Sequence, residues 1–115
     1  MTANQFRRIA LGMSGAVEAS HMDHPDFRAN GRIFATLDHE NVRGMVKLTP
    51  EQQRTFIKTA PEVFQPCNGA WGRQGCTNVY LAAVKTSMLR TALDAAATNV
   101  ASTAKTRKQP DRKLV

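Results

Sequence analysis

Two histidines and an aspartate stand close together in residues 21–24 (HMDH). Imidazole and carboxylate groups are ligands of zinc and related metals, and Glu18 or His39 could add a further ligand. The segment lacks the helical His-Glu-x-x-His pattern that places two histidines on one face of a helix. The alternative, which we favour, is that one of these side chains caps the following turn. The sequence therefore predicts no metal site and no cofactor.

The two cysteines, Cys67 and Cys76, are nine residues apart and form no Cys-x-x-Cys motif. A cysteine becomes a good nucleophile when its thiol pKa is lowered. Arg73 could lower it, but no histidine is close in the sequence. We therefore expect two reduced thiols in and beside a loop, with a disulfide as the less favoured alternative. Because the chain also lacks a Gly-x-Ser-x-Gly elbow and a close pair of carboxylates, we predict that the protein is not an enzyme.

A glycine-rich segment, Trp71-Gly72-Arg73-Gln74-Gly75, contains the only tryptophan. Two glycines let a backbone approach a ligand closely, and Arg73 and Gln74 could contact a phosphate or the edge of a base. The segment is not a P-loop, because no Lys-Ser/Thr pair follows it before a helix. The alternative is a loop fixed by a buried Trp71, and we expect a structural role for this side chain.

Alternation along two expected strands predicts a basic face on a sheet. Side chains of a strand point to opposite faces in turn. The core-facing set would be Ile33, Ala35 and Leu37, and the opposite set would be Arg32, Phe34 and Thr36, with Arg43, Met45 and Lys47 on the same side of the next strand. Cations around an aromatic ring suit phosphates and stacked bases, so this face is a candidate DNA-binding surface. The alternative is a solvated polar face with Phe34 packed in a minor cluster.

The chain has 115 residues, 16 of them basic and 9 acidic, with a formal net charge of +7. The charge is uneven, since residues 104–115 hold five basic residues and one acid, or +4, which leaves +3 for the rest. A segment with so little apolar content cannot bury enough surface to offset the entropy that it would lose on becoming ordered. We expect residues 1–103 to form one domain and residues 104–115 to form a mobile basic tail.

The pattern of elements predicts an α+β fold. Apolar spacing indicates helices over residues 3–14 and 86–101, and Thr49, Pro50 and Gln52 would cap a helix that ends near Thr59. Asn30-Gly31 predicts the turn of a β-hairpin. The expected strands are residues 16–20, 26–29, 32–37, 42–48 and 76–84, whereas residues 21–26 and 61–75 are expected to lack regular structure. This order, α-β-β-β-β-α-β-α, predicts a two-layer sandwich with helices mainly on one face of an antiparallel sheet of about five strands.

The compartment is suggested by what the sequence lacks. No stretch approaches the 18 or so apolar residues of a membrane span. The short apolar run near the N-terminus lacks the length and cleavage site of a signal peptide. We therefore expect a cytoplasmic protein.

Four segments together resemble the MmcQ/YjbR family. They are Gly31-Arg32-Ile33-Phe34-Ala35, Lys47-Leu48, Pro50-Glu51-Gln52 and Trp71 to Gly75, in this order. With a closing helix over residues 86–101, the resemblance covers about residues 5–101. Cys76 departs from the pattern, since many relatives have a tryptophan or a small residue there. The resemblance implies a fold akin to CyaY-like and secretion-chaperone-like α+β sandwiches, with a DNA-binding surface of the proposed "double wing" type.

Together with the charge, the resemblance implies a bacterial-type protein that binds DNA weakly through the phosphate backbone. The residues expected to bind DNA are Arg28, Arg32, Arg43, Lys47, Arg73, Gln74, Lys105, Arg107 and Lys108, with Phe34 and Trp71 as structural or stacking residues. The rival expectation is a chaperone-like module that binds a protein or a small ligand and no nucleic acid. In either case we expect a monomer or weak dimer without a membrane partner.

Overall fold

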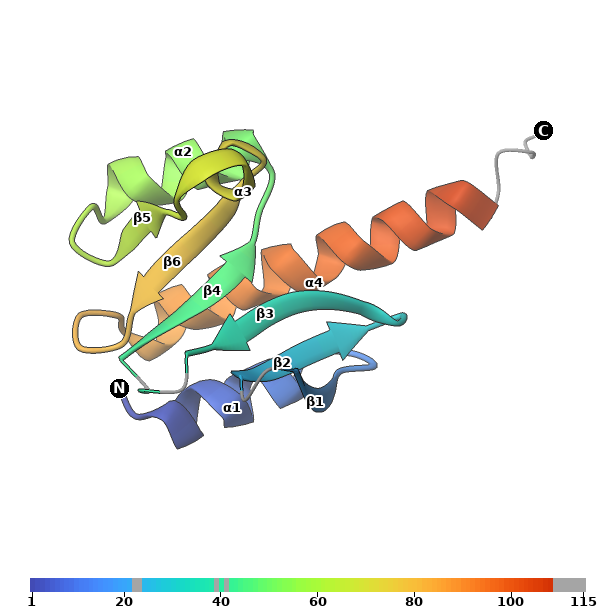
Figure 1. Ribbon diagram of the computed structural model, residues 1–115, viewed down its shortest axis with the longest axis horizontal. Helices are drawn as coiled ribbons and strands as arrows, with labels where there is room; N and C mark the ends of the chain where they lie inside the picture. The colour runs from blue at the N-terminus through green and yellow to red at the C-terminus, as the bar shows by residue number, and fades with distance from the viewer. Residues whose placement is uncertain (22–23, 39, 41, 109–115) are drawn as a thin grey trace.

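In the computed structural model the chain forms two layers, an open antiparallel sheet and a layer of helices (Figure 1). The structure describes residues 1–21, 24–38, 40 and 42–108, with side chains given up to residue 101, that of residue 21 excepted. The strands are β1 (Val17–His21), β2 (His24–Ala29), β3 (Arg32–Leu37), β4 (Arg43–Lys47), β5 (Phe64–Pro66) and β6 (Cys76–Tyr80). The helices are α1 (Ala3–Leu11), α2 (Pro50–Thr59), α3 (Gly69–Arg73) and α4 (Thr86–Lys108).

The six strands lie in the order β1-β2-β3-β4-β6-β5, and every neighbouring pair is antiparallel. The predicted α+β class is confirmed, with six strands in place of about five. No helix within the described residues is long and apolar enough to cross a membrane.

Helices α1 and α4 cover one face of the sheet, and the hydrophobic core lies between these layers (Figure 1). The ring of Phe6 on α1 lies 5.9 Å from that of Phe27 on β2, measured between centroids. The apolar stripe expected on the last helix faces this core, and its buried members are Leu89, Ala92, Leu93, Ala96 and Val100. Helix α2 packs near β5 and β6, where Phe56 and Phe64 are 5.1 Å apart. The opposite face of β3, β4 and β6 is left open.

The predicted start of α2 is confirmed by a reciprocal pair of hydrogen bonds. The Thr49 hydroxyl accepts from the backbone N–H of Gln52 at 3.1 Å, and the Gln52 side chain accepts from the N–H of Thr49 at 2.9 Å. Pro50 occupies the first turn, where its missing N–H costs nothing. The helix therefore begins where the local sequence satisfies its free N–H groups.

Two segments expected to be irregular contain regular structure. Residues 61–75 hold β5 and α3, and residues 24–26 belong to β2, where Pro25 lies opposite Ser20. A proline is tolerated near the start of a strand, because the N–H that it lacks is less often needed there. Helix α1 ends at Leu11, before residue 14, and β6 ends at Tyr80, before residue 84. Helix α4 runs past residue 101 to Lys108, so residues 104–108 are helical, and the rest of the expected tail lies outside the described residues.

Strict alternation fails along β3. Phe27 of β2 lies opposite Ala35, but Arg28 lies opposite Ile33, so Phe34 is an extra residue on its strand. A bulge of this kind shifts the side chains on either side of it. Phe34 is fully buried, whereas Ile33 and Thr36 line the open face. The expectation that Ile33 faces the core and Phe34 the open face is therefore wrong.

Candidate functional site

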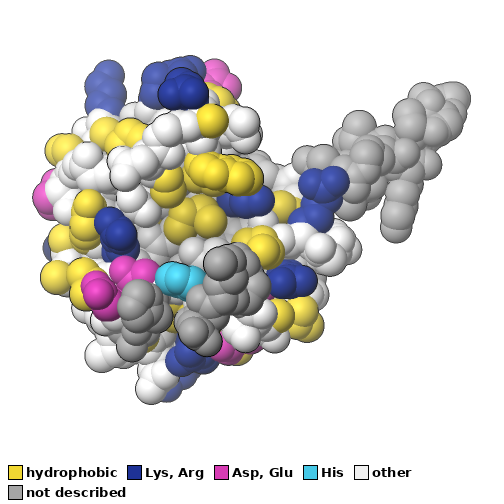
Figure 2. All heavy atoms as spheres, in the orientation of Figure 1, with side chains coloured by type: hydrophobic (Ala, Val, Ile, Leu, Met, Phe, Trp, Pro, Cys, Tyr) yellow, Lys and Arg dark blue, Asp and Glu magenta, His cyan; other side chains and the backbone are white. Residues whose placement is uncertain are grey.

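A groove crosses the open face of the sheet and consists of two adjoining depressions. The larger has a volume of about 360 Å³ and is lined by residues of β3, β4 and α3, among them Ile33, Lys47 and Trp71. The smaller, of about 190 Å³, includes Arg43 of β4. Thr36 and Met45 line both depressions. The two depressions therefore form one continuous surface, here called the sheet groove. Figure 2 shows this face, with hydrophobic side chains gathered over its middle and Lys and Arg side chains around them.

The register of the sheet explains which side chains share the groove. On β4, Gly44 and Val46 are buried against the helical layer, so Arg43, Met45 and Lys47 point to the open face, as predicted. Lys47 pairs with Cys76 on β6, Met45 pairs with Asn78, and Arg43 pairs with Tyr80. On the other side, Met45 pairs with Thr36 of β3. The groove is thus built from cross-strand rows of a rigid sheet.

Trp71 lies on the rim of the sheet groove and is 63% exposed, so the expectation of a buried tryptophan is wrong. The reason is the way that α3 packs. A Cβ atom at Gly72 would overlap the carbonyl oxygen of Cys67, so α3 rests on the chain through its glycine, and the indole is directed outward. A Cβ at Gly75, where φ is +113°, would likewise overlap the carbonyl oxygen of Leu48. The two glycines serve close backbone packing, and no ligand is needed to explain them.

Gln53 of α2 holds α3 in place, and sequence reasoning missed it. Its side-chain N–H₂ donates to the carbonyl oxygens of Gly72 at 2.9 Å and Cys76 at 3.0 Å, and lies 3.2 Å from the Thr77 hydroxyl. Only 8% of the residue is exposed. The signal was present in the spacing, since Gln53 falls three residues before Phe56 on the inward face of the helix.

The predicted DNA-binding cations differ in how far their charge is already balanced. Arg28 forms two hydrogen bonds, of 2.8 and 3.1 Å, with the fully buried carboxylate of Asp26, which raises the pKa of Arg28. Arg43 lies 3.5 Å from a carboxylate oxygen of Asp38. Three other cations form no ion pair with any described residue: Arg32 at the start of β3, Lys47 in the groove and Arg73 at the end of α3.

The remaining predicted residues fall into three groups. Gln74 is exposed and caps the end of α3. Phe34 lies in the core and cannot reach a ligand on the open face. The backbone of Lys105, Arg107 and Lys108 belongs to α4, and their side chains are outside the described part.

Both cysteines are free, and both line the larger depression. Burial, followed by the neighbouring Cys76, raises the pKa of the Cys67 thiol to about 11, against a smaller lowering by Arg43. Burial also raises the pKa of the Cys76 thiol, and the positive charge of Lys47 opposes this rise only in part. The cations that lower the thiol pKa values are therefore Arg43 for Cys67 and Lys47 for Cys76, whereas the sequence had suggested Arg73 as a candidate. Protonated thiols are weak nucleophiles at neutral pH.

The histidine segment brings His21 of β1 opposite His24 of β2 in the register of the sheet. Asp23, a candidate ligand of this segment, and His39, considered as a further ligand, lie outside the described residues. Within the part of the chain that the structure describes, no group of three or more His, Cys, Asp or Glu side chains could hold a metal ion.

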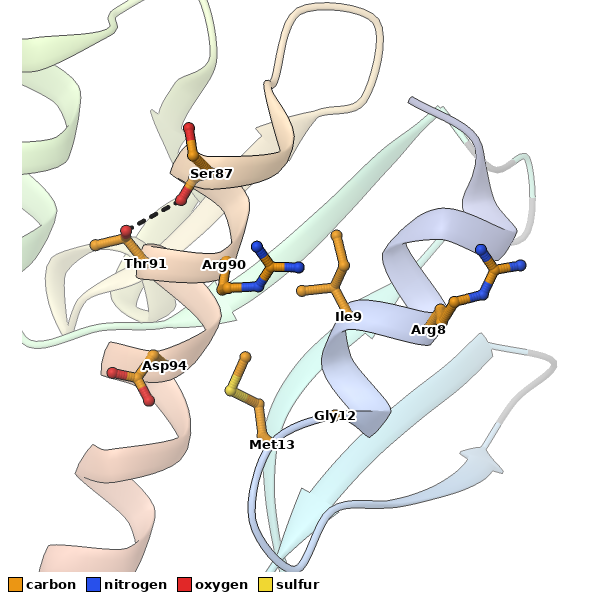
Figure 3. Close-up of a pocket in the computed structure, with 8 residues that line it drawn as sticks. All are labelled: Arg8, Ile9, Gly12, Met13, Ser87, Arg90, Thr91 and Asp94. Carbon is orange, nitrogen blue, oxygen red and sulfur yellow. Dashed lines mark hydrogen bonds between the residues drawn. The ribbon is translucent and has the colours of Figure 1, made fainter.

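A second cavity, of about 660 Å³, lies between α1 and α4 (Figure 3). Arg90 extends from α4 toward Ile9, and Met13 points into the space between the helices, whereas Arg8 points away from α4. The Thr91 hydroxyl donates to the carbonyl oxygen of Ser87 within α4, at 3.0 Å. This cavity is larger than either depression of the sheet groove, and its polar lining residues are Arg8, Ser87, Arg90, Thr91 and Asp94.

Comparisons with known proteins can now be set beside this geometry. The model of the YjbR family matches residues 11–96, about three quarters of the chain. The chain belongs to the YjbR family. The resemblance predicted from the four segments is confirmed, and the YjbR match contains every strand from β1 to β6 and thus the whole sheet groove.

The crystal structure of Deinococcus radiodurans protein DR2400, described as a DUF419 domain, is similar to this YjbR chain with a TM-score of 0.67. The two share 17% sequence identity, and the similarity covers 97% of this chain and 83% of that one. At this identity the likeness shows the fold alone. No curated protein matches the chain.

Proposed function

We propose that the protein binds nucleic acid without acting as an enzyme, and that the sheet groove holds a single strand of DNA. The observation that carries this proposal is the placement of the exposed Trp71 and Lys47 in one depression. A cation binds the phosphate backbone, and an exposed aromatic ring stacks on a base. The structure thus offers both groups that a single strand requires, on one rigid surface.

The cations support weak, mainly electrostatic binding. Lys47 and Arg73 form no ion pair with the described residues and are available to phosphates. Arg32 pairs with the buried Ala29, on the helical side of the sheet, so the expectation that it shares the open face is wrong. Arg43 and Arg28 contribute less, because each already lies beside a carboxylate. With so few available charges, we expect affinity to fall with salt by about 1.4 log units per log unit, since each phosphate contact on a single strand contributes about 0.7.

The aromatic group supports a single strand over a duplex. Stacking on an exposed aromatic side chain contributes about 1–3 kcal/mol per base, and it needs a base whose face is accessible. Bases of a duplex are stacked on one another, so Trp71 would gain little from them. Gln74, next to Arg73 at the end of α3, could contribute a contact to a base edge.

The test is a titration of a fluorescein-labelled oligothymidylate followed by anisotropy, at 50 and 200 mM salt, beside a matched duplex. We expect the single strand to bind more tightly, with Trp71→Ala weakening binding by about 5-fold or more and Lys47→Gln by about 3- to 10-fold. The control is Lys58→Gln, which removes the same charge from an exposed position on α2 away from the groove. Equal loss in the control and in Lys47→Gln would contradict the proposal.

The basic residues at the end of α4 need a separate experiment, because they could bind DNA without the sheet groove. The triple variant Lys105→Gln, Arg107→Gln and Lys108→Gln keeps the full chain and removes three charges. We expect a lower salt dependence with the effect of Trp71→Ala retained. If the triple variant abolishes binding while Trp71→Ala and Lys47→Gln have no effect, the groove is not the binding surface.

A second candidate rests on the apolar lining of the same groove. Ile33, Met45 and Trp71 give the larger depression an apolar lining that also suits a small ligand or a protein segment. In that case binding would be insensitive to salt, and light scattering after size exclusion would show a stable complex or a dimer. We favour the nucleic-acid function because of the unpaired cations, and the reduced thiols fit a bacterial cytoplasmic site of action.

A further inference from the structure

Three sulfur-bearing side chains line the larger depression of the sheet groove. They are Met45 of β4, Cys67 just after β5 and Cys76 at the start of β6. No described residue that lines this depression carries a carboxylate or an imidazole. The sequence gives no sign of such a cluster, because the fold brings its members together from three different segments.

The two cysteines face each other across antiparallel chain segments. The backbone N–H of Cys67 donates to the carbonyl oxygen of Cys76 at 3.0 Å, which continues the register in which Pro66 pairs with Thr77. Residues directly opposite each other on antiparallel strands have their side chains on the same face of the sheet. Both cysteines accordingly line the same depression.

Met45 is placed next to this pair through Asn78. The Cys67 thiol donates to the side-chain oxygen of Asn78 at 3.4 Å. Asn78 in turn pairs with Met45 across β6 and β4. Met45 is therefore the cross-strand neighbour of the residue to which the Cys67 thiol donates its hydrogen bond.

Two cations lie beside the sulfurs and partly offset the burial that raises the pKa of both thiols. Lys47 pairs with Cys76 across β4 and β6, and Arg43 acts electrostatically on Cys67. A monovalent metal ion bound by two thiolates has a net charge of −1. Lys47, which forms no ion pair with the described residues, would offset that charge.

We propose that Cys67, Cys76 and Met45 form a binding site for a soft monovalent metal ion of the Cu(I) class. Thiolate and thioether sulfurs select such ions over those that prefer oxygen or imidazole ligands. On binding, each thiol releases one proton to solvent and forms one metal–sulfur bond, and the metal keeps its oxidation state. The site shares the larger depression and Lys47 with the proposed nucleic-acid surface. Its test uses the metal ion alone, so either proposal can fail without the other.

The test is an anaerobic titration in which the reduced full chain competes with bicinchoninate for Cu(I). We expect one equivalent to transfer, with loss of the colour of the bicinchoninate complex. Because Trp71 lines the same depression and is the only tryptophan, its emission should change and saturate at one equivalent. The double variant Cys67→Ser with Cys76→Ser should lower the affinity by about 100-fold, and Met45→Leu by about 10-fold.

The matched control is Met13→Leu, which removes a thioether from the cavity between α1 and α4 and should leave the affinity unchanged. Circular dichroism checks that each variant is folded, and Cys67→Ser alone, at the more exposed cysteine, carries the test if the double variant does not fold. Unchanged Cu(I) affinity in the serine variants would overturn the proposal. So would an affinity for Zn²⁺ equal to that for Cu(I).

Discussion

The side-chain amide of Gln53 donates a hydrogen bond of 2.9 Å to the carbonyl oxygen of Gly72 and so joins α2 to α3. The same amide reaches the carbonyl oxygen of Cys76 on β6. One buried glutamine therefore fixes the short helix that carries Trp71 relative to the strand that carries Cys76. The larger depression of the sheet groove, which Trp71 and Cys76 line, therefore depends on this contact.

Gln53→Ala should destabilise the fold by about 1–3 kcal/mol, because it removes two buried hydrogen bonds between α2 and its neighbours. Each carbonyl oxygen keeps one backbone donor, Gly75 for Gly72 and Cys67 for Cys76. The matched control is Gln65→Ala. Gln65 also donates to a backbone carbonyl, that of Pro61 at 2.8 Å, but it is exposed, so its loss should cost less than about 0.5 kcal/mol. Urea unfolding followed by circular dichroism measures both. Equal effects of the two substitutions would show that Gln53 does not hold α3.

Gly72→Ala should be more harmful than an ordinary helix substitution, because the added Cβ would overlap the backbone of Cys67. Backbone cannot yield as a flexible side chain can, so we expect a loss of about 3 kcal/mol or more, together with a shift in Trp71 emission as α3 moves. Gly12→Ala is the control, since φ there is −76° and the nearest atom to the added Cβ is 3.3 Å away. Thermal unfolding of the two variants makes the comparison, and a mild effect at Gly72 would contradict the packing described for α3.

Two capping boxes in the chain allow another matched comparison. Gln5 closes the box at α1 and Gln52 the box at α2, with the same pair of bonds to the preceding threonine. Gln52 also accepts a hydrogen bond from Asn99 of α4 at 2.8 Å. Gln52→Ala should therefore cost about 1 kcal/mol more than Gln5→Ala. Chemical denaturation of both variants measures the difference, and Asn99→Ala should remove most of it.

Short-range signals predicted much of this fold. Thr49, Pro50 and Gln52 marked the start of α2, since capping depends only on neighbouring residues. Asn30 and Gly31 form the predicted turn with φ of +55° and +75°, because both residue types tolerate positive φ. Each of these features is decided within four residues, and each was confirmed.

The candidate site was harder to predict, because it depends on contacts between distant segments. Nothing in the alternation of β3 reveals the bulge that moves Phe34 into the core and Ile33 onto the open face. The outward position of Trp71 follows from the contact of Gly72 with Cys67, which exists only after β5 and β6 have paired. The cations on β4 were placed correctly because that strand alternates regularly.

The raised thiol pKa values predict a loss of stability at high pH. In the folded protein the pKa of Cys67 is about 11, against 9.0 for an unperturbed thiol. Between these two values the unfolded chain releases the Cys67 proton while the folded chain keeps it, so the free energy of unfolding decreases as the pH rises. Below pH 9 the contribution is fully present. Because Cys67 is only half-buried, we expect a loss on the order of 1 kcal/mol.

Urea unfolding of the reduced, metal-free protein at pH 8, 9, 10 and 11 measures this loss. Lysines titrate in the same range, so the informative quantity is the difference between the unchanged chain and Cys67→Ala. The two should differ in stability by a constant amount up to about pH 9 and converge toward pH 11, where the thiol no longer favours the folded state. Parallel curves over the whole range would contradict the assigned burial of Cys67. The Arg73→Gln variant should behave as the unchanged chain does, since Arg43 is the cation that acts on this thiol.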